Sequence, residues 1–315
     1  MKILVLGANG FIGSRLVRLL KEQALSIRVL TRKPALFDAT QLEVFAGDLT
    51  DPQLNVDDLL SGCDVVINCA GEIRNEQLMP ALHVDAVERL LSAVGRARSR
   101  TGRLRWVQLS SVGAYGPAAG RERIVTEQTP ANPQGTYEVT KTQADELIMS
   151  HPALQGDFAD WAILRPSNVF ADDMPNASIR QLGAMIRKKL FFYVGYKEAI
   201  ATYIHADDVA AALVRCAVDP RASRQLYNLS NDCPFSEVVN ALAAAQGVSS
   251  PRLRVPEGVV RLAVWVAGKV TRLPLTQGRV DALVNKTAYP IGKIRDELNF
   301  VPRYSVPAHI SEVLK

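Results

Sequence analysis

Cysteine and histidine are both scarce in this sequence of 315 residues, which has four of each. The cysteines, at positions 63, 69, 216 and 233, form no CxxC pair, which argues against a disulfide scaffold or a paired-thiolate zinc site. The histidines, at positions 83, 151, 205 and 309, lack the spacing of metal ligands, so we expect no metal. The simplest interpretation is a reduced, cytoplasmic protein with buried thiols.

Long hydrophobic runs are also missing. The start of the chain, MKILVLGANG, has an apolar run too short for a secretory signal, and no segment is long enough to span a bilayer. The nearest candidate, VVRLAVWVAGKV at 259–270, is interrupted by Arg261. We interpret it as a buried helix, with contact to a membrane surface as the alternative.

Charge of one sign is only modestly in excess. Lysine and arginine number 37 against 32 aspartates and glutamates, a net charge of +5. This excess suits an anionic ligand, but the cations are spread along the chain, so we do not expect a nucleic-acid partner. With 48% hydrophobic residues, the chain can bury one large core or two modest ones.

The sequence does contain a regular alternation of short apolar runs and amphipathic segments. We predict strands at KILVL (2–6), SIRVL (26–30), LEVFA (42–46), DVVIN (64–68), RWVQLS (105–110) and WAILR (161–165). Between strands, residues 14–24 and 85–97 repeat apolar positions at helical spacing. The alternation predicts βαβ units, and hence an α/β protein with a Rossmann-type, doubly wound parallel sheet.

After about residue 170 the character of the sequence changes, because helices with irregular connections replace the alternation. We predict a smaller C-terminal substrate lobe formed by residues 170–199 and 231–315. One further strand–helix unit, at 202–218, is expected to return to the main sheet or its edge. The dinucleotide-binding domain then comprises residues 1–169 and 200–230.

The first predicted strand leads directly into GANGFIG, in which three glycines have GxxGxxG spacing. Glycine permits the tight turn, the approach of backbone to a pyrophosphate and the close packing of helix on strand. The helix N-terminus then offers unpaired N–H groups and a positive dipole end to phosphates. In this strand-to-helix context the motif predicts a dinucleotide site rather than a plain turn. Its predicted cofactor residues are Gly7, Asn9, Gly10, Phe11, Ile12 and Gly13.

The second strand ends in VLTRKP, where a site for NAD usually has an acidic residue that binds the ribose 2′-hydroxyl. Arg32 and Lys33 stand there instead. Because cations favour a 2′-phosphate, we predict NADP(H), with NAD(H) as the alternative cofactor. The other interpretation is that both residues simply cap an exposed strand end.

Two later strand ends extend the predicted cofactor site. GDLTD follows the third strand and places Asp48 and Leu49 within reach of the adenine. NCAG ends the fourth strand with Cys69, Ala70 and Gly71, small residues where a cofactor passes close to the backbone.

The segment GTYEVTKTQADEL places Tyr137 and Lys141 one turn apart at the start of a predicted helix, so that both side chains reach the same small site. By itself this spacing is more often a solvated helix face than a catalytic pair. The surrounding motifs decide between the two interpretations.

Taken in order, GANGFIG, GDLTD, NCAG, LSSVGAYG, YEVTK, LRPSNVF and YIHADDVA resemble the extended short-chain dehydrogenase/reductase family, which includes nucleotide-sugar epimerases, dehydratases and reductases. The resemblance covers nearly the whole chain. It implies that Tyr137 is the catalytic acid/base and that Lys141 binds the nicotinamide ribose and lowers the pKa of the tyrosine. It also implies that Ser111 binds the substrate oxygen, with Ser110 as the neighbouring alternative.

The same resemblance assigns Pro166 to packing against the cofactor and Asn168 to the substrate. Relatives that hold a nucleoside diphosphate often carry an arginine two residues before the tyrosine of the YIH segment, where this chain has Ala201. Arg279, near the place of a second such arginine, is the candidate to compensate, although a lone arginine is more often a surface residue.

Three functional hypotheses follow. The first is 4-epimerisation or 4-keto reduction of a nucleotide-activated sugar in polysaccharide synthesis. The second keeps the chemistry but replaces the substrate by a hydrophobic alcohol or ketone, steroid-like or flavonoid-like. The third is a cofactor-binding assembly protein without turnover, although a complete Ser-Tyr-Lys set argues for catalysis. Proteins that the chain resembles commonly form homodimers, which leaves a homodimer as an open expectation.

Overall fold

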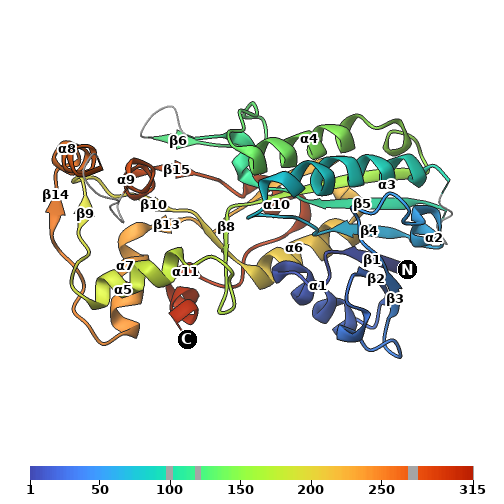
Figure 1. Cartoon of the computed structure of the whole chain (residues 1–315), viewed down its shortest axis with the longest axis horizontal. Helices are drawn as coiled ribbons and strands as arrows, with labels where there is room; N and C mark the ends of the chain where they lie inside the picture. The colour runs from blue at the N-terminus through green and yellow to red at the C-terminus, as the bar shows by residue number, and fades with distance from the viewer. Residues whose placement is uncertain (97–101, 118–121, 269–275, 315) are drawn as a thin grey trace.

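The computed structural model describes residues 1–96, 102–117, 122–268 and 276–314. At its centre lies a seven-stranded parallel sheet with the strand order β12-β7-β5-β4-β1-β2-β3 (Figure 1). Its strands, in chain order, are β1 (Lys2–Leu6), β2 (Ser26–Thr31), β3 (Glu43–Ala46), β4 (Val65–Asn68), β5 (Leu104–Leu109), β7 (Ala159–Pro166) and β12 (Gln225–Leu229). The predicted Rossmann-type α/β fold is confirmed.

Helices cover both faces of this sheet (Figure 1). In β1, Ile3 and Val5 pack on one side with α1 (Phe11–Glu22) and α6 (Ala206–Val218). Leu4 and Leu6 pack on the other side, where the covering helices are α2 (Val56–Leu60), α3 (Ala86–Val94) and α4 (Thr136–Ser150). Burial of both faces explains why the central strands are continuous apolar runs rather than alternating ones.

One edge of the sheet differs from the prediction. The strand of the YIHADD motif, β11 (Tyr203–His205), does not join the central sheet but pairs with β8 (Asn168–Phe170). The seventh strand is instead β12, beside β7. The reason is a change of partner along the chain: the N–H of Ser167 donates to Leu229 O at 2.9 Å, and the next N–H, of Asn168, donates to Thr202 O at 3.2 Å.

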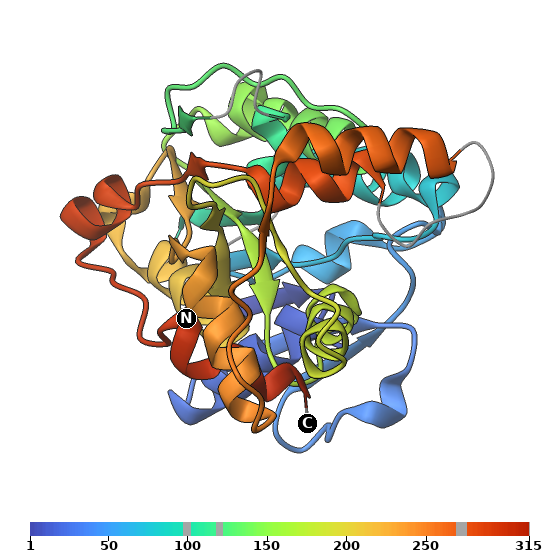
Figure 2. The same ribbon diagram turned by 90° about the vertical axis from the view of Figure 1, so that its left-hand side faces the viewer.

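The remaining elements build the C-terminal lobe, which faces the viewer in Figure 2. Its helices are α5 (Ser178–Arg187), α7 (Phe235–Ala245), α8 (Glu257–Gly268), α9 (Gln277–Val284) and α11 (Val306–His309). Short strand pairs brace them: β9 (Tyr193–Val194) with β14 (Arg254–Val255), β10 (Ile200–Ala201) with β13 (Cys233–Pro234), and β6 (Arg123–Ile124) with β15 (Thr287–Ala288). A later helix, α10 (Gly292–Leu298), places Ile294 and Leu298 in the core of the central sheet.

Helix α8 covers most of the segment that the sequence predicted as a buried helix, of which residues 269 and 270 lie outside the described ranges. The prediction of a buried helix is wrong for one of the two faces of α8. Val260 and Val264 are buried, because α8 packs on the lobe with only one face. The opposite face is exposed and carries Val259, Leu262, Trp265 and Val266. Within the described ranges, no helix combines the length and the apolar character needed to cross a bilayer.

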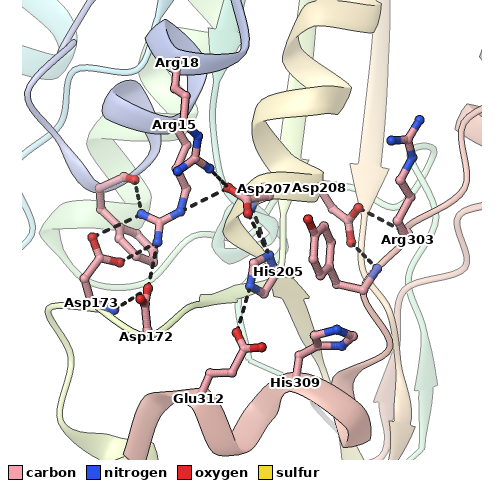
Figure 3. Close-up of polar contacts among 12 residues, drawn as sticks. Arg15, Arg18, Asp172, Asp173, His205, Asp207, Asp208, Arg303, His309 and Glu312 are labelled. Carbon is pink, nitrogen blue, oxygen red and sulfur yellow. Dashed lines mark hydrogen bonds and ion pairs between the residues drawn. The ribbon is translucent and has the colours of Figure 1, made fainter. Parts of the chain in front are cut away.

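A polar cluster fastens the C-terminal segment to β11 and α6 (Figure 3). The buried carboxylate of Asp208, at the start of α6, accepts the backbone N–H groups of Arg303 at 2.8 Å and Tyr304 at 3.1 Å. His205 is buried beside it and stacks on the Tyr304 ring, with 4.2 Å between the centroids. Its Nδ1 accepts the N–H of Asp207 at 3.2 Å, so His205 caps the start of α6 and has a structural role.

Candidate cofactor and catalytic site

The carboxyl ends of β1 to β4 open onto a cavity of about 430 Å³. It lies where the strand order reverses between β1 and β4, the place at which open parallel sheets bind ligands. The predicted cofactor residues that line it are Gly7, Asn9, Gly10, Arg32, Lys33, Asp48, Leu49, Cys69, Ala70 and Gly71.

The backbone of this cavity tolerates only glycine at two positions. Gly7 has φ +77°, and a Cβ added to it would lie 2.7 Å from the Ala70 nitrogen. A Cβ added to Gly13 would lie 2.1 Å from the Gly7 oxygen. Both contacts are far shorter than packing allows, so β1, β4 and α1 approach this closely only because the side chains are missing.

The first turn of α1 presents backbone rather than side chains to this cavity. Gly10 precedes the helix and provides no capping side chain. The ring of Phe11 lies under the Arg15 guanidinium, 4.7 Å from its centroid, and Ile12 is buried in the core. A cradle of bare backbone at a helix N-terminus fits a pyrophosphate, so the residues present suit a dinucleotide.

Groups of both charges line the cavity at the ends of β2 and β3. The Arg32 guanidinium is 76% exposed and lies 3.5 Å from the Asp48 carboxylate. A hydrogen bond from the backbone N–H of Thr50 lowers the pKa of Asp48, and Arg32 lowers it further. Nearby, the Thr31 hydroxyl donates to Asn9 Oδ1 at 2.8 Å and fixes that side chain at the mouth of the cavity.

Lys141 lies behind the wall of this cavity, against Ala70 and Gly71. Its side chain is buried, and its Nζ donates to Leu109 O at 3.0 Å and to Ala70 O at 3.2 Å. A Cβ on Gly71 would lie 3.4 Å from the same nitrogen. Burial lowers the pKa of Lys141 to about 8. The fold thus places one buried amine against two of the residues that line this cavity.

Tyr137 precedes Lys141 by one turn on α4, as the spacing predicted. Its ring meets the His83 ring edge to face, with 5.6 Å between the centroids. Burial, reinforced by the charges of Glu138 and Asp145, raises the pKa of Tyr137 to about 12. The resemblance implied a shift in the opposite direction caused by Lys141, but burial dominates here and keeps the phenol protonated.

The two candidate serines after β5 have different surroundings. Ser110 is buried, and its hydroxyl donates to Asp145 Oδ2 at 2.7 Å. Ser111 is only half-buried and caps the short helix η4 (Val112–Tyr115), where its Oγ accepts the N–H of Gly113 at 3.0 Å. Ser110 is therefore committed to the interior, and Ser111 is the serine that remains suited to contact a substrate.

Sequence reasoning missed Asp145, which lies on the same face of α4 as Tyr137 and Lys141. It is completely buried and accepts the Nε and Nη2 groups of Arg165, each at 2.9 Å, besides the Ser110 hydroxyl. The repeated spacing of four residues is the signal that would have found it.

His83 is a second functional candidate that the sequence did not reveal. It lies in a π-helical turn, η3 (Ala81–Asp85), a feature that often marks functional sites. Its Nε2 accepts the Glu72 N–H at 2.9 Å, so Nδ1 carries the proton and donates to Thr140 Oγ1 at 2.8 Å. His83 thereby ties the loop after β4 to α4. Among the residues that the structure describes, no three His, Cys, Asp or Glu side chains could hold a metal ion.

A second cavity, of about 300 Å³, lies between α5, α9 and the β10–β11 segment. Its walls include Asn168 and Arg279, which the sequence assigned to the substrate, and Ala201, which stands where relatives often have an arginine. Most of the other lining side chains are apolar, among them Leu182, Met185, Phe191, Phe192, Phe235 and Leu283. Pro166, the last residue of β7, is buried and lines neither cavity.

The chain matches the model of the NAD dependent epimerase/dehydratase family over residues 3–230. It belongs to this family. Over 99% of its length it is 25% identical to a 3 beta-hydroxysteroid dehydrogenase/Delta 5-->4-isomerase of Mycobacterium tuberculosis, of which 89% is covered. Over 99% of its length it is also 22% identical to an Escherichia coli O157:H7 N-acetyl-alpha-D-glucosaminyl-diphospho-ditrans,octacis-undecaprenol 4-epimerase, of which 94% is covered.

The fold of this family member is also that of solved structures. MoeE5 in complex with UDP-glucose and NAD superimposes with a TM-score of 0.72 and 23% identity, covering 100% of this chain and 97% of MoeE5. This likeness concerns the fold.

Proposed function

We propose that this protein is an NAD(P)-dependent enzyme that carries out 4-epimerisation or 4-keto reduction of a nucleotide-activated sugar, with Ser111, Tyr137 and Lys141 at its catalytic centre. The observation that carries the proposal is the position of Lys141. Its buried amine touches Ala70 and lies against Gly71, which line the cavity suited to a dinucleotide, while Tyr137 stands one turn away.

A bound nicotinamide would supply or accept the hydride. The chain's own groups handle the proton and the geometry. Ser111 orients the substrate oxygen, and Tyr137 donates a proton to that oxygen during reduction or accepts one during oxidation. The phenol of Tyr137 is in its acid form at neutral pH, as the proton donor of a ketone reduction must be. Lys141 fixes the orientation of the cofactor ribose.

A second candidate substrate is a hydrophobic alcohol or ketone, and the apolar second cavity favours it. Ala201 stands where relatives that bind nucleoside diphosphates often have an arginine, and Arg279 is the cation that lines the cavity. The relatives reported above include a hydroxysteroid enzyme and an enzyme for a sugar attached to an undecaprenol diphosphate, and both of these substrates carry a large apolar part.

Calorimetric titration of UDP, dTDP and GDP into protein loaded with NADPH separates the two substrates. Saturable binding of one nucleotide, weakened at least tenfold in Arg279→Ala, supports the nucleotide-activated sugar. Absence of binding for all three directs the search to apolar ketones and lipid-linked sugars. Turnover is tested separately with Tyr137→Phe, which we expect to abolish activity while cofactor affinity stays within about twofold, because only a proton-transfer group is removed.

A further inference from the structure

Helix α8 is apolar on two opposite faces. The inner face is buried against the β9–β14 pair and α9, with Val260 at 4% and Val264 at 8% exposure. On the outer face Val259, Leu262, Trp265 and Val266 are between 49% and 61% exposed. The outer face of a surface helix is normally polar, and contiguous exposed apolar side chains mark a surface that binds something.

Exposed cations lie at the same end of the molecule as this apolar stripe. Arg187, Lys188 and Lys189, at the C-terminal end of α5, and Arg252, just before β14, are exposed, and no described residue forms an ion pair with their side chains. Two more exposed apolar residues, Leu190 and Leu253, stand directly beside them in the chain.

These segments belong to one end of the molecule. The N–H of Tyr193 donates to Leu253 O at 2.9 Å, and β9 and β14 run side by side toward α8. Figure 2 looks onto this end and shows α8 lying across it, with α5 seen along its axis. We call this surface the α8 face. It consists of Leu190, Leu253, Val259, Leu262, Trp265 and Val266, with the cations Arg187, Lys188, Lys189 and Arg252 at its edge.

We propose that the α8 face docks the protein on the surface of a lipid bilayer that contains anionic lipids. Apolar side chains that enter the headgroup region, together with cations that meet anionic headgroups, form the combination that holds a protein in the plane of the interface. A second copy of this chain fits less well, because two identical faces would oppose like charges.

Docking would also bring the second cavity close to the bilayer. The use of that cavity for a substrate rests on the proposed function, whereas docking itself does not. That cavity is lined by Leu182 and Met185 of α5 and by Leu283 of α9, helices at the same end of the molecule as the α8 face. Phe192 and Leu283 line the cavity and also pack against the cluster that contains Val260. An amphiphilic substrate in the leaflet that contacts the α8 face would therefore lie beside the second cavity.

Trp265 makes the proposal directly measurable. Of the three tryptophans, Trp106 is fully buried and Trp161 is 8% exposed, whereas Trp265 is 57% exposed. We expect the protein to sediment together with phosphatidylglycerol/phosphatidylcholine vesicles. We also expect these vesicles to shift its tryptophan emission to shorter wavelength. Pure phosphatidylcholine vesicles or high salt should weaken both effects.

The vesicle partition coefficient of the double variant K188Q/K189Q should be about 25-fold lower, about fivefold for each cation removed. The vesicle partition coefficient of Leu262→Ser should be roughly tenfold lower.

Phe158→Ser is the matched control, because Phe158 is 82% exposed but directly precedes β7, at the amino end of the strands, whereas the C-terminal lobe lies beyond their carboxyl ends. Its vesicle binding should equal that of the unaltered protein. All variants should retain NADPH affinity, which separates a loss of docking from a damaged fold or a failed cofactor site. Failure to bind anionic vesicles, or equal loss in Phe158→Ser, would overturn the proposal. A dimer in lipid-free solution that Leu262→Ser dissociates would also overturn it and assign the face to a second copy.

Discussion

Asp145 offers the sharpest test of how this site is built. Its carboxylate is completely buried and is hydrogen-bonded to Ser110 and, through two nitrogens, to Arg165. Arg165 is itself only 4% exposed, with its guanidinium 4.9 Å from the centroid of the Tyr115 ring. The variant Asp145→Leu would leave this guanidinium buried without its counter-charge. Breaking one partner of such a pair costs about 3 to 5 kcal/mol, a large part of the stability of most domains.

The assay is urea unfolding followed by circular dichroism, with the double variant Asp145→Leu/Arg165→Met as the control. Removing both charges leaves no unpaired ion, so we expect the double variant to recover most of the lost stability. Asp145→Asn, which keeps the shape and one acceptor, should fall between the two. A cost below about 1 kcal/mol for Asp145→Leu, or no recovery in the double variant, would refute the idea that this ion pair organises the interior beside Ser111.

Four further predictions concern the cofactor site. Arg32→Ala should weaken NADPH binding about tenfold in fluorescence titrations and leave NADH binding unchanged, because only NADPH has a 2′-phosphate; equal losses would contradict the predicted preference for NADP. Gly13→Ala should abolish cofactor binding, since its Cβ has no room, whereas Gly156→Ala, with open space around it, should bind normally. Cofactor affinity should fall as the pH rises through about 8, because Lys141 is charged below that pH and neutral above it, and Lys141→Met should remove this step. His83→Phe should cost about 1 kcal/mol in urea unfolding, since the half-buried N–H of Glu72 loses its acceptor; an unchanged midpoint would exclude this positioning role.

The sequence by itself determined the elements whose information is local. The apolar runs predicted six strands of the central sheet, because most of these runs are buried on both faces and β3, at the edge, is partly covered. GANGFIG predicted the turn that only glycine permits, and the four-residue spacing of Tyr137 and Lys141 placed both on one helix face, as the structure confirms.

Only the tertiary structure decided the partners and the burial of these groups. Asp145 accepts the hydroxyl of Ser110, which is 35 positions away in the chain, and Lys141 donates to the carbonyl of Ala70, which is 71 positions away. The direction of the Tyr137 pKa shift and the two apolar faces of α8 were likewise settled by what packs around them. Desolvation and strand pairing depend on residues that are distant in the chain, so no local pattern encodes them.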